Sequence, residues 1–208
     1  MHDDGGDGEV VWSSRGVVSA VDLVGRTALI GYADGRLELV GARSGKSRHV
    51  GEAAETIGCV ALGDDLSWAV AGAESGEVML VDDLQRAPTT RTTRLPVAPR
   101  AIAYSAQMRA VLVLDAGAHL SLFSLDPVAE RLWCNDRFPE LRAVGFSDDN
   151  HLAYGYTRDG RLLVLAIDSG RRLSCAASPR ADRLARRQVA SEIVTPDPAR
   201  EPSHSSAA

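Results

Sequence analysis

The chain has 208 residues, and 45% of them are hydrophobic, a share that is ordinary for a protein with a packed core. Its net charge is −5 and there is no overall basic field, so a nucleic-acid backbone is not an expected partner. The apolar stretches are strand-sized and interrupted by Gly, Asp and Arg, so no segment is expected to span a membrane.

The first nine residues are acidic and lack the apolar stretch of a secretory signal. We therefore expect residues 1–9 to form a flexible acidic N-terminus and the protein to be cytoplasmic. Lys46 is the single lysine among 23 basic residues, and this preference for arginine is typical of a GC-rich genome, which indicates a bacterial source.

One sequence unit then repeats four times along the chain at a nearly constant period. Equivalent apolar residues mark the unit at Leu37, Val78, Leu120 and Leu162. Each lies in an alternating apolar run, and three of these runs follow a turn dipeptide, namely Asp34-Gly35, Ser75-Gly76 and Asp159-Gly160. A fixed period of this length, combined with short strands, predicts the blades of a β-propeller.

Each unit is predicted to contain four short strands separated by turn signals. The first strands are expected at residues 17–23, 57–62, 100–104 and 142–146, and the second at 28–32, 68–72, 110–114 and 152–156. The third strands are expected at 36–40, 77–81, 119–123 and 161–165, and short polar fourth strands at 47–50, 90–94, 130–134 and 171–175. Small residues crowd the first two strands, which suits the inner part of a blade.

Glycine residues predict the turns inside the units. Gly35 and Gly160 are expected to supply the positive φ of a tight turn between the second and third strands, and Gly45 and Gly170 the same between the third and fourth. The segment Gly45-Lys46-Ser47 also resembles the end of a phosphate-binding loop. Such a loop joins a strand to a helix, whereas this segment lies in a strand hairpin, so nucleotide binding is not expected there.

Residues 144–155, followed by the run at 159–165, resemble a WD40-type blade, and the resemblance covers residues 17 to 175. The Trp-Asp dipeptide of that family would fall at residues 40–41, 81–82, 123–124 and 165–166, and the tryptophan is missing from all four. The Gly-His pair before the first strand is also missing. The blades are therefore degenerate, and the family's Asp-His-Ser-Trp hydrogen-bond network is not expected.

The predicted fold is all-β, a β-propeller of four WD40-like four-stranded blades over residues 10–175. Four blades are few for such a ring, and each blade must bury both of its faces. Three arrangements stay open: a small closed ring in which residues 9–12 add a strand, two chains that form a larger ring, or a partial propeller that a different protein completes. Residues 176–208 are predicted to be a disordered tail with a short helix at 181–190, whose arginine cluster could dock on an acidic surface.

The cysteine and histidine residues suggest no chemical site. Cys59, Cys134 and Cys175 are odd in number, which argues against a disulfide framework, and the last two occupy the same position in consecutive units. The five histidines show no metal-ligand spacing, and no serine lies in a nucleophile elbow. No catalytic, cofactor-binding or metal-binding residue is therefore assigned.

Partner binding is expected on one rim of the propeller, where the loops between units gather arginine and aromatic side chains, the usual anchors of interfaces. The candidate residues are Arg94, Arg100, Trp133, Arg137, Phe138 and Arg142. The alternative is that the aromatic side chains pack between blades. The resemblance implies a non-enzymatic protein-interaction scaffold, linked to a bacterial ATPase or kinase system or forming a homo-oligomer that completes the ring. The alternatives are a metal-dependent, lactonase-like hydrolase and a fragment of a longer propeller.

Overall fold

The computed structural model describes residues 16–41, 43–126, 129–138 and 140–177, without the side chains of 136–137 and 176–177. The predicted acidic N-terminus at 1–9, the strand suggested for residues 9–12 and the predicted helix at 181–190 lie outside the described residues.

All sixteen elements in the described part of the chain are β-strands, and every repeat unit forms one four-stranded antiparallel sheet. Sheet 1 contains β1 (Val18–Val24), β2 (Thr27–Tyr32), β3 (Arg36–Gly41) and β4 (Ser47–Glu52). Sheet 2 contains β5 (Ile57–Leu62), β6 (Trp68–Ala73), β7 (Glu77–Asp82) and β8 (Thr89–Arg94). Sheet 3 contains β9 (Pro99–Ser105), β10 (Ala110–Asp115), β11 (His119–Ser124) and β12 (Glu130–Arg137). Sheet 4 contains β13 (Leu141–Phe146), β14 (Leu152–Thr157), β15 (Arg161–Ala166) and β16 (Arg172–Ala177).

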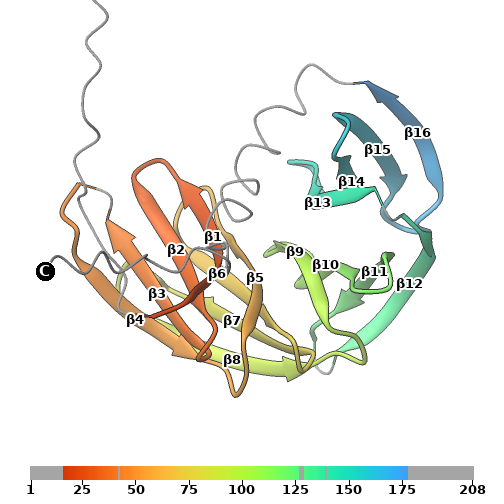
Figure 1. Ribbon diagram of the computed structural model, residues 1–208. Helices are drawn as coiled ribbons and strands as arrows, with labels where there is room; N and C mark the ends of the chain where they lie inside the picture. Colours follow the sequence, from red (N-terminus) through yellow and green to blue (C-terminus); the bar gives the residue numbers. More distant parts are fainter. Residues whose placement is uncertain (1–15, 42, 127–128, 139, 178–208) are drawn as a thin grey trace, which may run out of the picture.

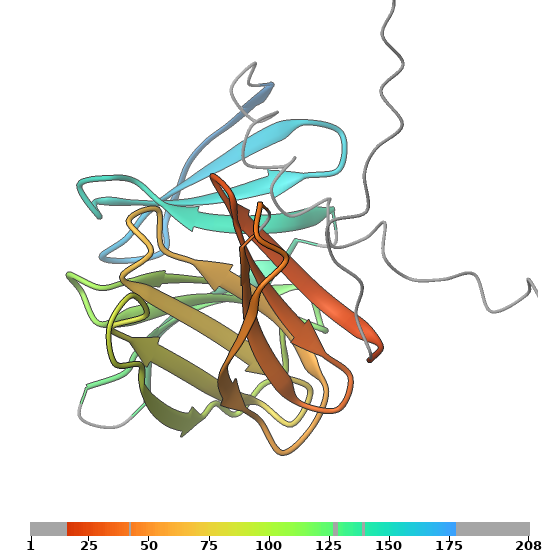
Figure 2. The same cartoon turned by 90° about the vertical axis from the view of Figure 1, so that its left-hand side faces the viewer.

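The four sheets follow one another along an arc, like blades set around a common centre (Figure 1). The first strand of each sheet is innermost, so that β1 contacts β5, β5 contacts β9 and β9 contacts β13. The fourth strands lie on the outside of the arc (Figure 1). Figure 2 shows the arc from the side of sheet 1, with sheet 4 at the top of the view.

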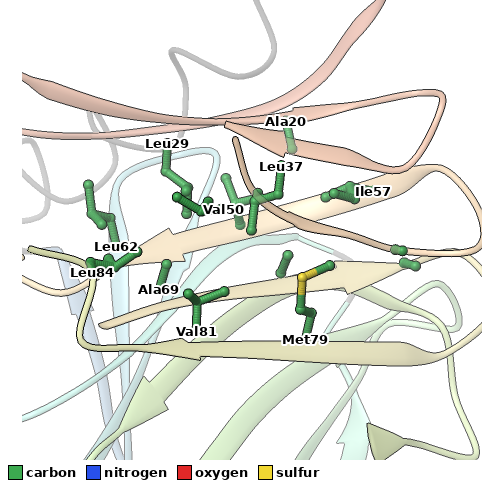
Figure 3. Packing of buried hydrophobic residues seen from close by; sticks show 14 of the residues in the cluster. Ala20, Leu29, Leu37, Val50, Ile57, Leu62, Ala69, Met79, Val81 and Leu84 are labelled. Atoms are coloured by element: carbon green, nitrogen blue, oxygen red, sulfur yellow. The ribbon is translucent and has the colours of Figure 1, made fainter. Parts of the chain in front are cut away.

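Apolar side chains fill the space between consecutive sheets. Between sheets 1 and 2, Leu29 and Leu37 face Ile57, Leu62 and other buried residues (Figure 3). Similar clusters join sheet 2 to sheet 3 and sheet 3 to sheet 4. Among the described residues, no cluster and no strand ladder joins sheet 4 to sheet 1. The described part of the chain is thus an all-β arc of four sheets, and closure into a ring is not seen in it.

The predicted turn chemistry is confirmed by the backbone. The turn between the second and third strands has a positive φ of 88° at Gly35, 84° at Gly76 and 78° at Gly160. In sheet 3 the equivalent turn uses Ala118, with a φ of 65°. Gly45 has a φ of 61° in the turn between β3 and β4, so the segment that resembles a phosphate loop is a hairpin turn, as predicted.

The fourth strands are longer than their sequences predict. They were expected to span four or five residues, but β4, β8 and β16 each contain six and β12 contains eight. These strands carry mostly exposed side chains, so the sequence offers little apolar alternation to mark them. Backbone hydrogen bonds to the third strand hold them instead, and these bonds do not depend on side-chain type.

Each inner strand carries one register shift near its start. The residue that lies between the two halves of the ladder is Ser19 in β1, Gly58 in β5, Arg100 in β9 and Arg142 in β13. A β-bulge redirects a side chain away from the ordinary alternation of a strand. The four bulge positions therefore present their side chains in a direction that the repeat pattern alone does not indicate.

Candidate functional site

A half-open cavity of about 170 Å³ lies between the inner strands of the four sheets. Residues from every sheet line it: Asp22, Ala61, Leu62, Asp64, Trp68, Ile102, Ala103, Tyr104, Ala143, Val144, Gly145, Phe146 and Tyr156. A water molecule takes up about 30 Å³ in the liquid, and pockets for drug-sized ligands span about 300–1,000 Å³. This axial cavity is therefore the size of a single side chain rather than of a cofactor.

Asp22 is the most unusual residue of the axial cavity. The register places it opposite Leu29, at the same point of the sheet as Ala61 in β5, Ala103 in β9 and Gly145 in β13. Asp22 is only 6% exposed, and its carboxylate accepts hydrogen bonds of 2.8 Å from the backbone N–H groups of Leu23 and Leu62. The bond to Leu62 ties sheet 1 to sheet 2, and backbone N–H donors stabilise the negative carboxylate.

Aromatic side chains form much of the remaining wall. The rings of Trp68 and Tyr104 meet edge to face, with centroids 5.1 Å apart and an interplanar angle of 80°. Burial raises the pKa of the Tyr104 and Tyr156 hydroxyls, so both remain neutral near physiological pH. Asp64, from the turn after β5, adds a second and more exposed carboxylate. None of the described residues that line the cavity is basic.

The described side chains offer no place for a metal ion. Within these ranges, no three His, Cys, Asp or Glu residues are grouped as metal ligands would be. These side chains give no support to the metal-dependent, lactonase-like alternative. The three thiols are free, and burial raises the pKa of Cys59 to about 12.

A second feature is a donor that recurs at the junctions between sheets. The first residue of an inner strand offers its carbonyl, and a side chain of the preceding inner strand donates to it. Ser19 Oγ donates to the carbonyl of Ile57 at 2.6 Å, and Arg100 Nη2 donates to that of Leu141 at 2.5 Å. Between sheets 2 and 3 the bulge residue is a glycine, and the neighbouring Cys59 thiol donates to the carbonyl of Pro99 at 3.5 Å.

Arg142 occupies the same bulge position in sheet 4, where no described sheet follows. Its Nη1 donates to the carbonyl of Leu141 at 3.2 Å. The side of sheet 4 that points away from sheet 3, here called the far face of sheet 4, carries a cluster of its own. Ala143 and Tyr156 are buried in it, and Tyr154 and Leu162 are half-buried. In the described part of the chain, no other sheet contributes to this cluster.

The structure separates the six residues predicted to bind a partner. Arg100 and Arg142 come together at the carbonyl of Leu141. Trp133 and Phe138 are half-buried against the core between sheets 3 and 4, and Trp133 Nε1 donates to the carbonyl of Ile167 at 2.7 Å. Arg94 is exposed at the end of β8, and Arg137 ends β12 with its side chain outside the description. Partner binding by these residues stays a prediction.

The sequence did not single out the residues of the axial cavity. An acid at a position of small residues could have indicated the cavity, but only with the first unit correctly aligned to the other three. Ser19 lies closer to Gly58 in sequence than Gly58 does to Arg100 or Arg100 to Arg142, and these last two spacings are equal. The repeat spacing therefore places the first unit out of phase. With the structural register, Asp22 stands out as an acid at a position that is otherwise alanine or glycine.

Comparison with protein-family models and with curated proteins finds no match. Among solved structures, the chain is similar to the crystal structure of the computationally designed Ika4 protein, with a TM-score of 0.55 and 19% sequence identity. The similar region covers 77% of this chain and 99% of that one. At this identity the likeness concerns the fold alone. No helix in the described ranges is long and apolar enough to cross a membrane.

Proposed function

We propose that the protein is a non-enzymatic interaction module of the WD40-like β-propeller type. A protein partner continues the arc of blades by packing against the far face of sheet 4. The observation that carries this proposal is the cluster on that face. Tyr154 and Leu162 place apolar surface there, and no described sheet packs on it, whereas the other face of sheet 4 is buried against sheet 3.

The junctions inside the chain support the same assignment. At each of them, a side chain near the start of one inner strand donates to the first carbonyl of the next inner strand. Arg142 holds the corresponding bulge in the last sheet, on the strand that an added blade would follow. Arginine and tyrosine are also the residues that most often dominate binding energy at protein interfaces.

A site-specific photo-crosslinker tests the proposal. Tyr154 is replaced by benzoylphenylalanine, an aromatic residue of similar shape, and the protein is irradiated inside the cells that produce it. The matched control carries the same residue at position 132, because Leu132 is 51% exposed on the bulged outer strand β12, away from the far face of sheet 4. We expect one discrete crosslinked protein from position 154 and none from position 132.

The identity of the crosslinked species decides between partners. A second copy of the chain is recognised by mixing isotope-labelled and unlabelled protein, and sedimentation then shows a dimer that Leu162→Glu dissociates. A different protein is identified by mass spectrometry, which also tests the expected link to an ATPase or kinase system. The proposal is wrong if position 154 crosslinks no more than position 132 and the chain sediments as a monomer at every concentration.

A further inference from the structure

The axial cavity has the chemistry of a site for one organic cation. Its lining combines the aromatic residues Trp68, Tyr104, Phe146 and Tyr156 with the acidic residues Asp22 and Asp64. Aromatic faces attract guanidinium and ammonium groups, most strongly where water is excluded, and a carboxylate nearby adds to this attraction. The described lining contributes negative charge and no positive charge.

We propose that the axial cavity binds a cationic side chain, and that its resident occupant is the arginine-rich segment of this chain at residues 180–187. The segment carries Arg180, Arg183, Arg186 and Arg187 against a single acid, Asp182. Its charge therefore complements that of the cavity. The cavity shares Ala143 and Tyr156 with the cluster on the far face of sheet 4, but the inference rests on Asp22, Asp64 and Trp68, which lie outside that cluster, so it does not depend on the proposed function.

The chain length allows this occupant to reach the cavity. The segment begins three residues after β16 ends at Ala177, on the outer edge of sheet 4. Crossing a four-stranded sheet from its outer to its inner strand requires about 15 Å, since neighbouring strands lie about 4.8 Å apart. Six extended residues span about 20 Å, so Arg183 and the arginines that follow it have sufficient reach.

Tethering also favours this occupant over a separate basic protein. A cavity that holds a single side chain offers few contacts, so a free cation would bind it weakly. A short linker keeps its end at an effective concentration in the millimolar range, on the order of what such a weak contact needs to be populated. A separate partner must then bind the cavity more tightly than the tethered segment does.

The test follows the indole N–H resonance of Trp68 by NMR in the full-length protein, assigned with a Trp68→Phe variant. Replacing the four arginines of the segment by glutamine removes the cations and retains the chain. We expect this variant to shift the Trp68 resonance and to leave that of Trp133 unchanged. The peptide acetyl-Gly-Arg-Gly-amide should then return the Trp68 resonance toward its original position.

Three comparisons make the outcome decisive. A peptide with neutral citrulline in place of arginine should have no effect, and the unmodified protein should need at least about tenfold more arginine peptide because the segment competes. Asp64→Asn should abolish the response. Asp148→Asn is the matched control, because Asp148 occupies the equivalent turn in sheet 4 without lining the cavity. With all three results the assignment stands.

Two results would overturn the proposal. If the arginine peptide shifts Trp68 in neither protein, the cavity is not a cation site. If it acts at the same concentration in the unmodified protein and in the glutamine variant, the segment is not the occupant, and a separate basic partner or a free small cation takes its place. Agmatine, a free guanidinium compound, separates those two sources, since only a protein partner requires flanking peptide.

Discussion

Gly76 and Gly160 allow one structural contact to be isolated by mutation. Both occupy the turn between the second and third strands, with φ values of 84° and 78°. A Cβ atom added at Gly76 would lie 2.6 Å from the carbonyl oxygen of Leu95, whereas one added at Gly160 would meet nothing within 4 Å. The Leu95 backbone cannot easily move aside, because its N–H donates to the carbonyl of Gly76 at 2.8 Å.

The two alanine variants should therefore differ by the steric term alone. An alanine at positive φ costs about 1–2 kcal/mol, and the loss of freedom in the unfolded chain returns about 0.4–1 kcal/mol. Gly160→Ala should thus lower the free energy of unfolding by about 1 kcal/mol. Gly76→Ala adds an overlap that typically costs about 1–3 kcal/mol, so its total should be about 2–4 kcal/mol.

Urea unfolding followed by circular dichroism and tryptophan fluorescence measures the difference, provided that both probes give the same transition. Ala118→Gly supplies an internal control, because Ala118 already has a φ of 65° in sheet 3. That variant should be neutral or stabilised by up to about 1 kcal/mol. If Gly76→Ala and Gly160→Ala agree within about 0.5 kcal/mol, the close approach of Leu95 to the turn is refuted.

Three further predictions concern single side chains. Asp22→Asn replaces a carboxylate that accepts from two N–H groups by an amide, and it should lower the free energy of unfolding in urea by about 1–3 kcal/mol. An unchanged free energy of unfolding would show that the bond to Leu62 does not stabilise the fold. Trp133→Phe leaves a carbonyl of sheet 4 without its donor and should cost about 1–2 kcal/mol in the same assay. At pH 8 a disulfide reagent should modify the exposed Cys134 rapidly, and Cys59, with its pKa raised by burial to about 12, only on unfolding. Equal rates would contradict this.

The repeat period predicted the sheets because it reports local physics that is the same in every unit. Alternating residues in β7 or β11 mark the two faces of a strand, and turn glycines such as Gly76 mark the positive φ between strands. These signals need only a few neighbouring residues. The length of the fourth strands was underestimated, because a strand such as β8 is exposed along most of its length and is held by its backbone ladder to β7.

The candidate site was harder to predict because it depends on residues from all four sheets. Asp22 in the first sheet and Tyr156 in the last are far apart in sequence and share one cavity. The bulges also escaped prediction, since an extra residue such as Arg100 shifts the register without changing the constant spacing of the last three units. Trp133 was a candidate for partner binding by residue type, but its burial between sheets depends on the turn of the neighbouring unit.

Departures from the repeat mark positions that packing between the sheets does not explain. Leu29, Leu37 and their equivalents in sheets 2 and 3 are buried between sheets, and apolar residues recur at these positions. Asp22 interrupts a position of small residues with a buried carboxylate, although burying a charge costs free energy even when it is hydrogen-bonded. An alanine there would satisfy the packing that its equivalents satisfy. The acid therefore has two roles: its carboxylate ties sheet 1 to sheet 2 through the N–H of Leu62, and it adds negative charge to the lining of the cavity, where the proposed cation would bind.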